Sequence, residues 1–322
     1  MTAEATDASV VQIQADELEA PPLSLGRMTW LRFRRHKMAM AGVVILILLF
    51  LYSFGGSIVF SEADANFTET GNRLSPPSAA HPFGTDTIGR DILARTIYGG
   101  QISLLIGVAA VVVMVIIGVL IGAVSGFFGG ATDAVLMRFT EAVLTVPSLF
   151  LLLVMAKFFG GRIPDLDLFG RTFSGSVIVI IVIIGLTSWT FLARIVRAEF
   201  LSLKENDFIM AARATGTSTG QIIFRHILPN TIAPIIVAAT IGVAGAIIAE
   251  AYISFLGLGV QPPTATWGNM MTGAYNYIDT APWLWFFPGL LILLTVLSIN
   301  FVGDGLRDAC LLYTSDAADE VV

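Results

Sequence analysis

The sequence predicts an all-α membrane protein with six transmembrane helices. Of its 322 residues, 55% are hydrophobic and only 13% are charged, whereas soluble domains carry roughly 25% charged residues. Six stretches lack Asp, Glu, Lys and Arg, and they meet or approach the ~20 apolar residues that span a bilayer. They are 39–60, 102–128, 142–156, 177–193, 231–249 and 283–303. A β-barrel is excluded, because runs such as 110–122 are apolar at both odd and even positions.

The segments before the second span have distinct compositions. Residues 1–26 hold five acids and no Lys or Arg, which is typical of a solvated, disordered tail. The first span, 39–60, is too long for the apolar region of a cleavable signal peptide. The loop 61–101 is rich in Pro, Ser and Gly, and we expect it to end in a short helix from Thr87 to Tyr98.

Glycine and proline mark two further features of the spans. Gly118, Gly122 and Gly126 recur every four residues, which places them on one helix face and lets another helix approach closely. The alternative is that glycines are simply common in membrane helices. Pro147 and Pro288 fall inside the third and sixth spans, where a missing N–H loosens a helix. Kinks at these two prolines would suit helices that move during function, or they would serve helix packing alone.

The positions of the basic residues predict the orientation, because Lys and Arg concentrate in cytoplasmic loops. With the N-terminus inside, twelve of the 18 basic residues fall in inner segments and six in outer ones. Both termini are therefore expected in the cytoplasm. The longest inner segment, between spans four and five, runs from Arg194 to Pro229.

Residues 207–229 within this segment read DFIMAARATGTSTGQIIFRHILP. Asp207 is the expected N-cap of a first short helix, and Gly216 suits its left-handed C-cap. Ser218 or Thr219 then caps a second short helix. The sequence therefore predicts a helix–turn–helix on the cytoplasmic face.

This hairpin, which Pro229 is expected to end, carries more apolar residues than a short exposed segment leaves in water. They include Ile209, Ala212, Ile222, Ile223, Ile227 and Leu228. Either the hairpin folds against the bundle, or a partner receives it in a groove.

The hairpin resembles the cytoplasmic signature of the inner-membrane permeases of binding-protein-dependent ABC importers. That signature is E-A-A, three residues, Gly, nine residues, then I-x-L-P. The matching positions here are Ala211, Ala212, Gly216, Leu228 and Pro229. Met210 replaces the Glu and His226 the Ile, and the forms A-A-R-A-x-G and R-H-x-L-P-N are similar to the peptide and nickel branch.

Three other regions resemble the C-type subunit of di- and oligopeptide permeases. They are 31–46, 81–104 and 249–271, and the likeness covers most of 27–308. The resemblance implies the following division of the chain. It comprises an acidic tail (1–26), an N-terminal permease segment with the first span (27–75), an outer loop and short helix (76–101), an importer transmembrane domain (102–309) and a non-native tail (310–322).

The resemblance also implies function and partners. The residues Met210, Ala211, Ala212, Gly216, Leu228 and Pro229 would seat the hairpin in a cleft of a cytoplasmic ATPase. The partners would be a second permease subunit, two cytoplasmic ATP-binding subunits, a periplasmic or extracellular solute-binding protein and membrane lipid. The protein would lie in the bacterial or archaeal cytoplasmic (inner) membrane and carry di- or oligopeptides, or nickel.

Several other functions are excluded or disfavoured. Lys37, Lys157 and Lys204 are followed by Met, Phe and Glu, so the chain has no phosphate-binding G-x-x-x-x-G-K-[ST] loop and is expected not to be an enzyme. No cofactor, metal site or nucleic-acid partner is expected. The main alternative is a secondary transporter driven by an ion gradient. It would need ionisable groups near mid-membrane, and the spans carry none.

Two charged positions and the C-terminal tail complete the predictions. Glu250, at the outer end of span five, is either a polar group at the mouth of the pathway or an interfacial carboxylate that reaches water by itself. Arg138 can pair with Glu141 three residues on. Residues 310–322 depart from the family pattern, so we assign no function to Cys310 or beyond.

Overall fold

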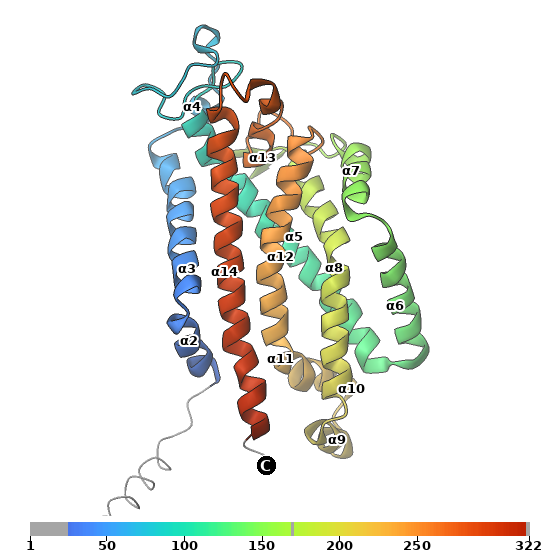
Figure 1. Cartoon of the computed structure of the whole chain (residues 1–322). Helices are drawn as coiled ribbons and strands as arrows, with labels where there is room; N and C mark the ends of the chain where they lie inside the picture. Colours follow the sequence, from blue (N-terminus) through green and yellow to red (C-terminus); the bar gives the residue numbers. More distant parts are fainter. Residues whose placement is uncertain (1–24, 169–170, 320–322) are drawn as a thin grey trace, which may run out of the picture.

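The computed structural model describes residues 25–168 and 171–319, and these form a bundle of long helices (Figure 1). Residues 1–24, which hold most of the predicted acidic tail, lie outside the described part. Five helices are long and apolar enough to cross a membrane. They are Lys37–Ile58, Ile92–Phe128, Gly175–Leu203, Ile232–Phe255 and Trp283–Cys310. All five coincide with predicted spans.

The third predicted span, 142–156, is broken. Helix α6 (Gly130–Thr145) and helix α7 (Ser148–Phe159) meet at an angle of 84°. Val146 and Pro147 between them have extended backbone, with ψ of 124° and 117°. Proline pushes the preceding residue out of the helical region and lacks an N–H for the helix. The described chain therefore has five spans, or six if the bent pair counts as one.

Helix α5 (Ile92–Phe128) replaces two predicted elements. The short helix expected from Thr87 to Tyr98 and the second span are one continuous helix of 37 residues, or about 55 Å. The helix begins at Asp91, whose carboxylate accepts from the backbone N–H of Ala94 at 2.9 Å. Because the helix is longer than the ~30 Å hydrocarbon core, its first turns project beyond the membrane span.

Short elements precede α5. Helix α2 (Leu25–Arg35) is followed by α3 (Lys37–Phe50), a π-helical turn η1 (Leu51–Gly55) and a 3-10 turn η2 (Gly56–Ile58). The outer loop contains α4 (Glu62–Asn66) and the 3-10 turn η3 (Thr70–Asn72). Ser61 caps α4, and its hydroxyl and backbone N–H hold the pKa of Asp64 below its usual range.

The elements after α7 complete the bundle. A two-stranded antiparallel hairpin pairs β1 (Leu166–Leu168) with β2 (Arg171–Phe173), with Asp167 opposite Thr172. The long helices α8 (Gly175–Leu203), α12 (Ile232–Phe255) and α14 (Trp283–Asp319) follow. Between α12 and α14 lie α13 (Trp267–Met270) and the 3-10 turn η5 (Ala274–Tyr277).

Helices α5 and α8 pack closely through the glycines of α5. A Cβ at Gly118 would lie 3.0 Å from Leu192, and one at Gly122 would lie 2.5 Å from the carbonyl oxygen of Ala193. At Gly126 it would lie 2.6 Å from the Cβ of Phe200. The absence of a side chain at these positions is what allows the two helices to touch along their C-terminal halves.

This packing predicts that Gly122→Ala destabilises the protein. The added methyl would force α5 away from α8, and overpacking of this kind costs about 1–3 kcal/mol. The matched control is Gly245→Ala in α12, where a Cβ meets nothing within 4 Å and the better helix propensity of Ala is expected to leave stability unchanged or raise it. The measurement is the thermal unfolding midpoint in detergent. Equal midpoints for the two variants would show that the contact is unimportant.

Candidate functional site

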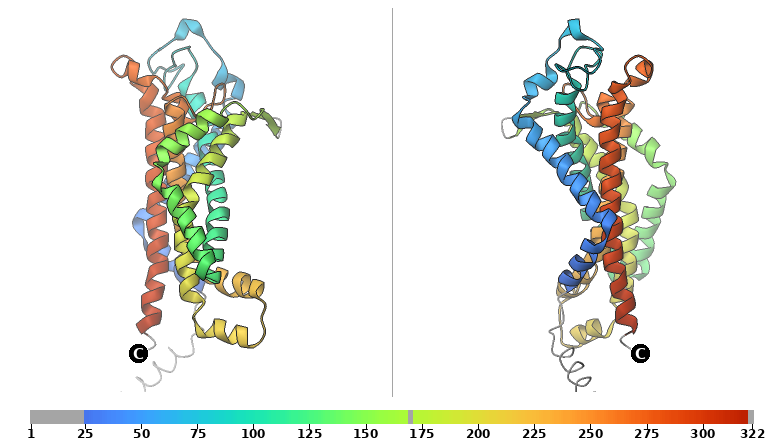
Figure 2. Two further views of the ribbon diagram at one scale, coloured as in Figure 1. Left: turned by 90° about the vertical axis from the view of Figure 1, so that its right-hand side faces the viewer. Right: turned by 60° about the vertical axis from the view of Figure 1, so that its left-hand side comes forward.

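The segment between α8 and α12 is a compact hairpin at one end of the bundle (Figures 1 and 2). Its first arm is α9 (Asp207–Ala214), which follows Asn206 as N-cap in place of the predicted Asp207. The predicted left-handed conformation of Gly216 is confirmed, with φ of +80°. The N–H groups of Gly216 and Thr217 donate to the carbonyls of Arg213 and Ala212, both at 3.0 Å, which closes the end of α9.

The second arm is longer and less regular than predicted. It runs through α10 (Thr219–Gln221), the π-helical segment η4 (Ile222–Ile227) and α11 (Leu228–Asn230). The predicted cap is confirmed at Ser218, which forms a capping box with Gln221. The prediction that Pro229 ends the helix is wrong, because Pro229 lies inside its last turn. Proline has no N–H to donate to a preceding carbonyl, and the wider π-helical turn lies directly before it. The side chain of Asn230 donates to the carbonyl of His226 at 2.6 Å.

One face of the hairpin is anchored in the core of the bundle. Ile209, Ile222 and Ile227 are 0%, 3% and 0% exposed. They belong to the same buried cluster as Val196 and Phe200 of α8. The hairpin therefore folds against the bundle along this face, which was one of the two predicted alternatives.

The opposite face stays open. Phe208, Met210 and Phe224 are 43%, 51% and 68% exposed, which is unusual for large apolar side chains on a surface outside the spans. Ala211 and Pro229 are exposed as well. The predicted coupling residues are thus not equivalent, since Ala212 and Leu228 are half-buried beneath this open face.

A partly buried ion pair joins the hairpin-bearing helix to its neighbours. The carboxylate of Asp133 in α6 accepts from Nε and Nη2 of Arg197 in α8, both at 2.5 Å, and also from the hydroxyl of Ser125 in α5. Close by, Nζ of Lys204 donates to the carbonyl of Gly126 at 3.2 Å. Three helices are therefore tied together at the point where α8 leads into the hairpin.

The predicted pair of Arg138 and Glu141 is confirmed at 3.0 Å, but it lies on the surface, with side chains 86% and 60% exposed. The sequence analysis did not predict the contact between Asp133 and Arg197. The two residues are 64 positions apart, so no local spacing could have indicated the contact.

Glu250 lies at the opposite end of the bundle and is 0% exposed. Its carboxylate accepts from the hydroxyl of Ser254 at 2.7 Å and from that of Ser103 in α5 at 3.1 Å. The alternative in which this carboxylate reaches water by itself is wrong, because Glu250 is fully buried. The two serines in turn accept hydrogen bonds from the backbone N–H groups of Val260 and Trp267, so the segment after α12 packs over this site. A role at the mouth of a pathway stays a prediction.

The same end is tied to the N-terminal helices through Trp267, which is fully buried. Its indole N–H donates to the carbonyl of Thr96 at 2.8 Å, and the hydroxyl of Thr96 bonds that of Tyr52 at 2.6 Å. Among the described residues no group of three or more His, Cys, Asp or Glu could hold a metal ion. The arrangement thus provides helices linked by polar contacts and an open apolar face on the hairpin. These features suit the transmission of movement through a membrane protein.

These features define a multi-span helical membrane protein, and comparisons identify its family. Residues 118–310 match the model of the binding-protein-dependent transport system inner membrane component, and residues 24–77 match the N-terminal transmembrane domain of oligopeptide transport permease C. The chain belongs to the family of inner-membrane permeases of binding-protein-dependent ABC transport systems. It is a non-catalytic transport component of the bacterial inner membrane.

Two relatives from Bacillus subtilis (strain 168) are similar over nearly the whole chain. The oligopeptide transport system permease protein OppC is 39% identical, covering 92% of this chain and 92% of its own length. The dipeptide transport system permease protein DppC is also 39% identical, covering 92% and 88%. A solved structure of the MetNI methionine ABC transporter has a TM-score of 0.51 at 21% identity, covering 66% of this chain and 95% of that chain. This last likeness supports the fold alone.

The ion pair of Asp133 and Arg197 predicts an asymmetric response to two similar substitutions. Arg197→Gln leaves the partly buried Asp133 without its hydrogen-bonded cation, and we expect a loss of about 2 kcal/mol of unfolding free energy. Arg138→Gln removes an exposed and longer ion pair, at 3.0 Å, and should change stability by less than about 1 kcal/mol. Both are measured by denaturant unfolding of the purified protein. A similar loss in both variants would contradict the structural role of Asp133.

Proposed function

We propose that this chain is the permease subunit of an ATP-driven importer and forms part of the membrane pathway for di- or oligopeptides. Membership of the permease family supports the transport role. The peptide cargo is supported by the relatives from Bacillus subtilis, which are named as oligopeptide and dipeptide permeases. These names favour peptides over nickel, the other cargo of the branch that the hairpin resembles.

The proposed partners follow from the same family. A second permease subunit completes the pathway, two ATP-binding subunits dock on the cytoplasmic side, and a solute-binding protein delivers the cargo from outside. Membrane lipid surrounds the spans. Because the chain has no phosphate-binding loop, the ATP that drives import must be hydrolysed on the partner subunits.

The open face of the hairpin is the observation that carries the proposal. Phe208, Met210 and Phe224 are exposed, although leaving such large apolar side chains in water is unfavourable. A groove in an ATP-binding subunit would cover them, as amphipathic helices are commonly received. Gly216 has no side chain, and the position where its Cβ would lie contacts nothing within 4 Å. The turn is therefore narrow and open at this point, so it can enter a narrow cleft of a partner.

The proposed orientation places both termini and the hairpin in the cytoplasm. The basic residues of α2, namely Arg27, Arg32, Arg34 and Arg35, lie at the same end of the bundle as the hairpin and the C-terminal end of α14 (Figure 1). Such a cluster favours the cytoplasmic side of a membrane. The loop 61–91 and α13 lie at the other end, where a binding protein would dock.

Movement would pass from the hairpin into the bundle along named contacts. ATP binding draws the two ATP-binding subunits together and displaces the hairpin. The displacement reaches α8 through the buried isoleucines and reaches α5 and α6 through Arg197, Ser125 and Asp133. The pathway then opens outward to accept the cargo, and hydrolysis resets it inward. An ion-driven secondary transporter would have no use for this hairpin.

Phe224→Ser tests this proposal. The side chain is 68% exposed, so the variant should fold and insert normally. It should bind the ATP-binding subunits about thirtyfold more weakly in co-purification, since an apolar anchor contributes about 2 kcal/mol or more at an interface. The matched control is Tyr275→Ser, which removes a side chain of 65% exposure at the opposite end of the bundle. Full retention of the ATP-binding subunits by Phe224→Ser would exclude this face as their docking site.

A further inference from the structure

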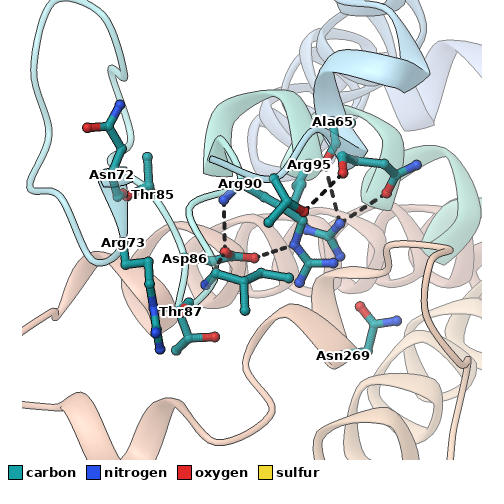
Figure 3. A network of polar contacts seen from close by, with 12 residues as sticks. Ala65, Asn72, Arg73, Thr85, Asp86, Thr87, Arg90, Arg95 and Asn269 are labelled. Atoms are coloured by element: carbon teal, nitrogen blue, oxygen red, sulfur yellow. Dashed lines mark hydrogen bonds and ion pairs between the residues drawn. The ribbon is translucent and has the colours of Figure 1, made fainter. Parts of the chain in front are cut away.

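A small pit opens at the end of the bundle opposite the hairpin. Its floor and walls come from the turn before α5, the first turn of α5 and the segment after α13. The residues used below are Asp86, Thr87, Arg90, Arg95, Met270 and Thr272. The pit has a volume of about 60 Å³, which is room for a few water molecules or one carboxylate group. We refer to it as the Arg95 pit; Figure 3 shows the polar contacts of Arg95, Asp86 and Arg90.

Arg95 is the unusual residue of this pit. It is only 3% exposed. Its Nη1 donates to the carbonyl oxygen of Ala65 at 3.4 Å and to Oδ1 of Asn66 at 3.2 Å, and both acceptors are uncharged. Within the described residues no carboxylate lies within ion-pair distance of Arg95. A guanidinium carries five N–H donors, and only those of Nη1 have a hydrogen-bond partner among the described residues. Arg95 therefore lines the pit with donors that are not used.

The nearest acids are already engaged. The carboxylate of Asp86 accepts from Nε of Arg90 at 2.6 Å and from the backbone N–H groups of Arg90 and Ile88, both at 2.9 Å. The carboxylate of Asp91 accepts from the N–H of Ala94 and contacts Nδ1 of His81 at 2.8 Å. Two cations and one anion therefore line the pit, which leaves one positive charge in excess.

The position in the helix strengthens this imbalance. Arg95 lies in the first turns of α5, where the helix dipole is positive and disfavours a cation. A buried charge without a counter-charge is costly, while a carboxylate that accepts two parallel N–H bonds from an arginine is among the strongest anion contacts in proteins. An anion in the pit would satisfy both the side chain and the helix end.

We propose that the Arg95 pit is a carboxylate-binding site used during transport. This rests on the proposed import function, in which two carboxylates reach this end of the bundle: the terminal carboxylate of a peptide, and an acidic side chain of the docked binding protein. The planar guanidinium fork matches a carboxylate from either source. Thr87 and Thr272 add hydroxyl groups at the wall of the pit.

The test uses the complete importer in lipid nanodiscs, with isotope-labelled formate as the probe because formate is small enough to enter the pit. We expect formate, but not neutral formamide, to show NMR line broadening with the wild-type importer. Arg95→Gln should weaken formate binding about tenfold or more. The control Arg162→Gln removes an exposed cation at the same end, which stacks on Phe158 at 4.4 Å, and should leave binding unchanged.

Competition then distinguishes the two sources. Displacement of formate by diglycine but not by diglycine amide assigns the site to the peptide carboxylate. Displacement by the peptide-free binding protein assigns it to an acidic side chain of that protein. The proposal is overturned if wild-type importer broadens formate and formamide alike, if Arg95→Gln binds formate as well as wild type, or if neither competitor displaces formate.

The wild-type comparison of formate with formamide keeps the proposal testable if Arg95→Gln fails to fold. Formate binding needs neither ATP nor transport, so it also separates this site from the proposed function. An importer that binds formate but takes up no peptide would refute the cargo and keep the carboxylate site. An importer that takes up peptide without binding formate would refute the carboxylate site and keep the peptide cargo.

Discussion

Three isoleucines buried beneath the hairpin hold it against the bundle, and the movement of the long helices depends on this contact. Ile209, Ile222 and Ile227 join the hairpin to the core cluster that α5 and α8 share, so the hairpin is a rigid extension of the bundle and not a loose loop. Because close-packed cores transmit displacement with little compression, a force on the outward face acts on the long helices. Without this anchor the exposed face could still bind a partner, but its movement would not reach the membrane.

Polar contacts fix the two ends of the helices that such a force would move. At the hairpin end, Asp133 holds α6, α5 and α8 together through Ser125 and Arg197. At the other end, Glu250 and Trp267 connect α12 and α13 to α5. Between these ends the contact is apolar and relies on the glycines of α5. Directional polar ties at the ends and small residues between them allow α5 and α8 to act as one unit.

Local signals in the sequence predicted much of this structure. Apolar runs located five spans, and the left-handed Gly216 and the Ser218 cap followed from side-chain chemistry within a few residues. Three features that the sequence missed or left open involve distant partners. The predicted break between a helix ending at Tyr98 and the span from 102 does not occur. Gly99 and Gly100, which lie in that interval, pack against Thr266 and Trp267. The partner of Asp133 lies 64 residues away, and Glu250 is buried by a loop that folds back over it. Packing between remote segments decided each case.

This polypeptide forms part of the membrane pathway and moves only when partner subunits bind and hydrolyse ATP. The most direct measurement is uptake of a labelled dipeptide into proteoliposomes that contain this chain alone, this chain with its second permease subunit, or the full assembly with ATP-binding subunits and binding protein. We expect accumulation against a gradient only in the full assembly and only with ATP. Accumulation by the chain alone, driven by an imposed ion gradient, would contradict the account.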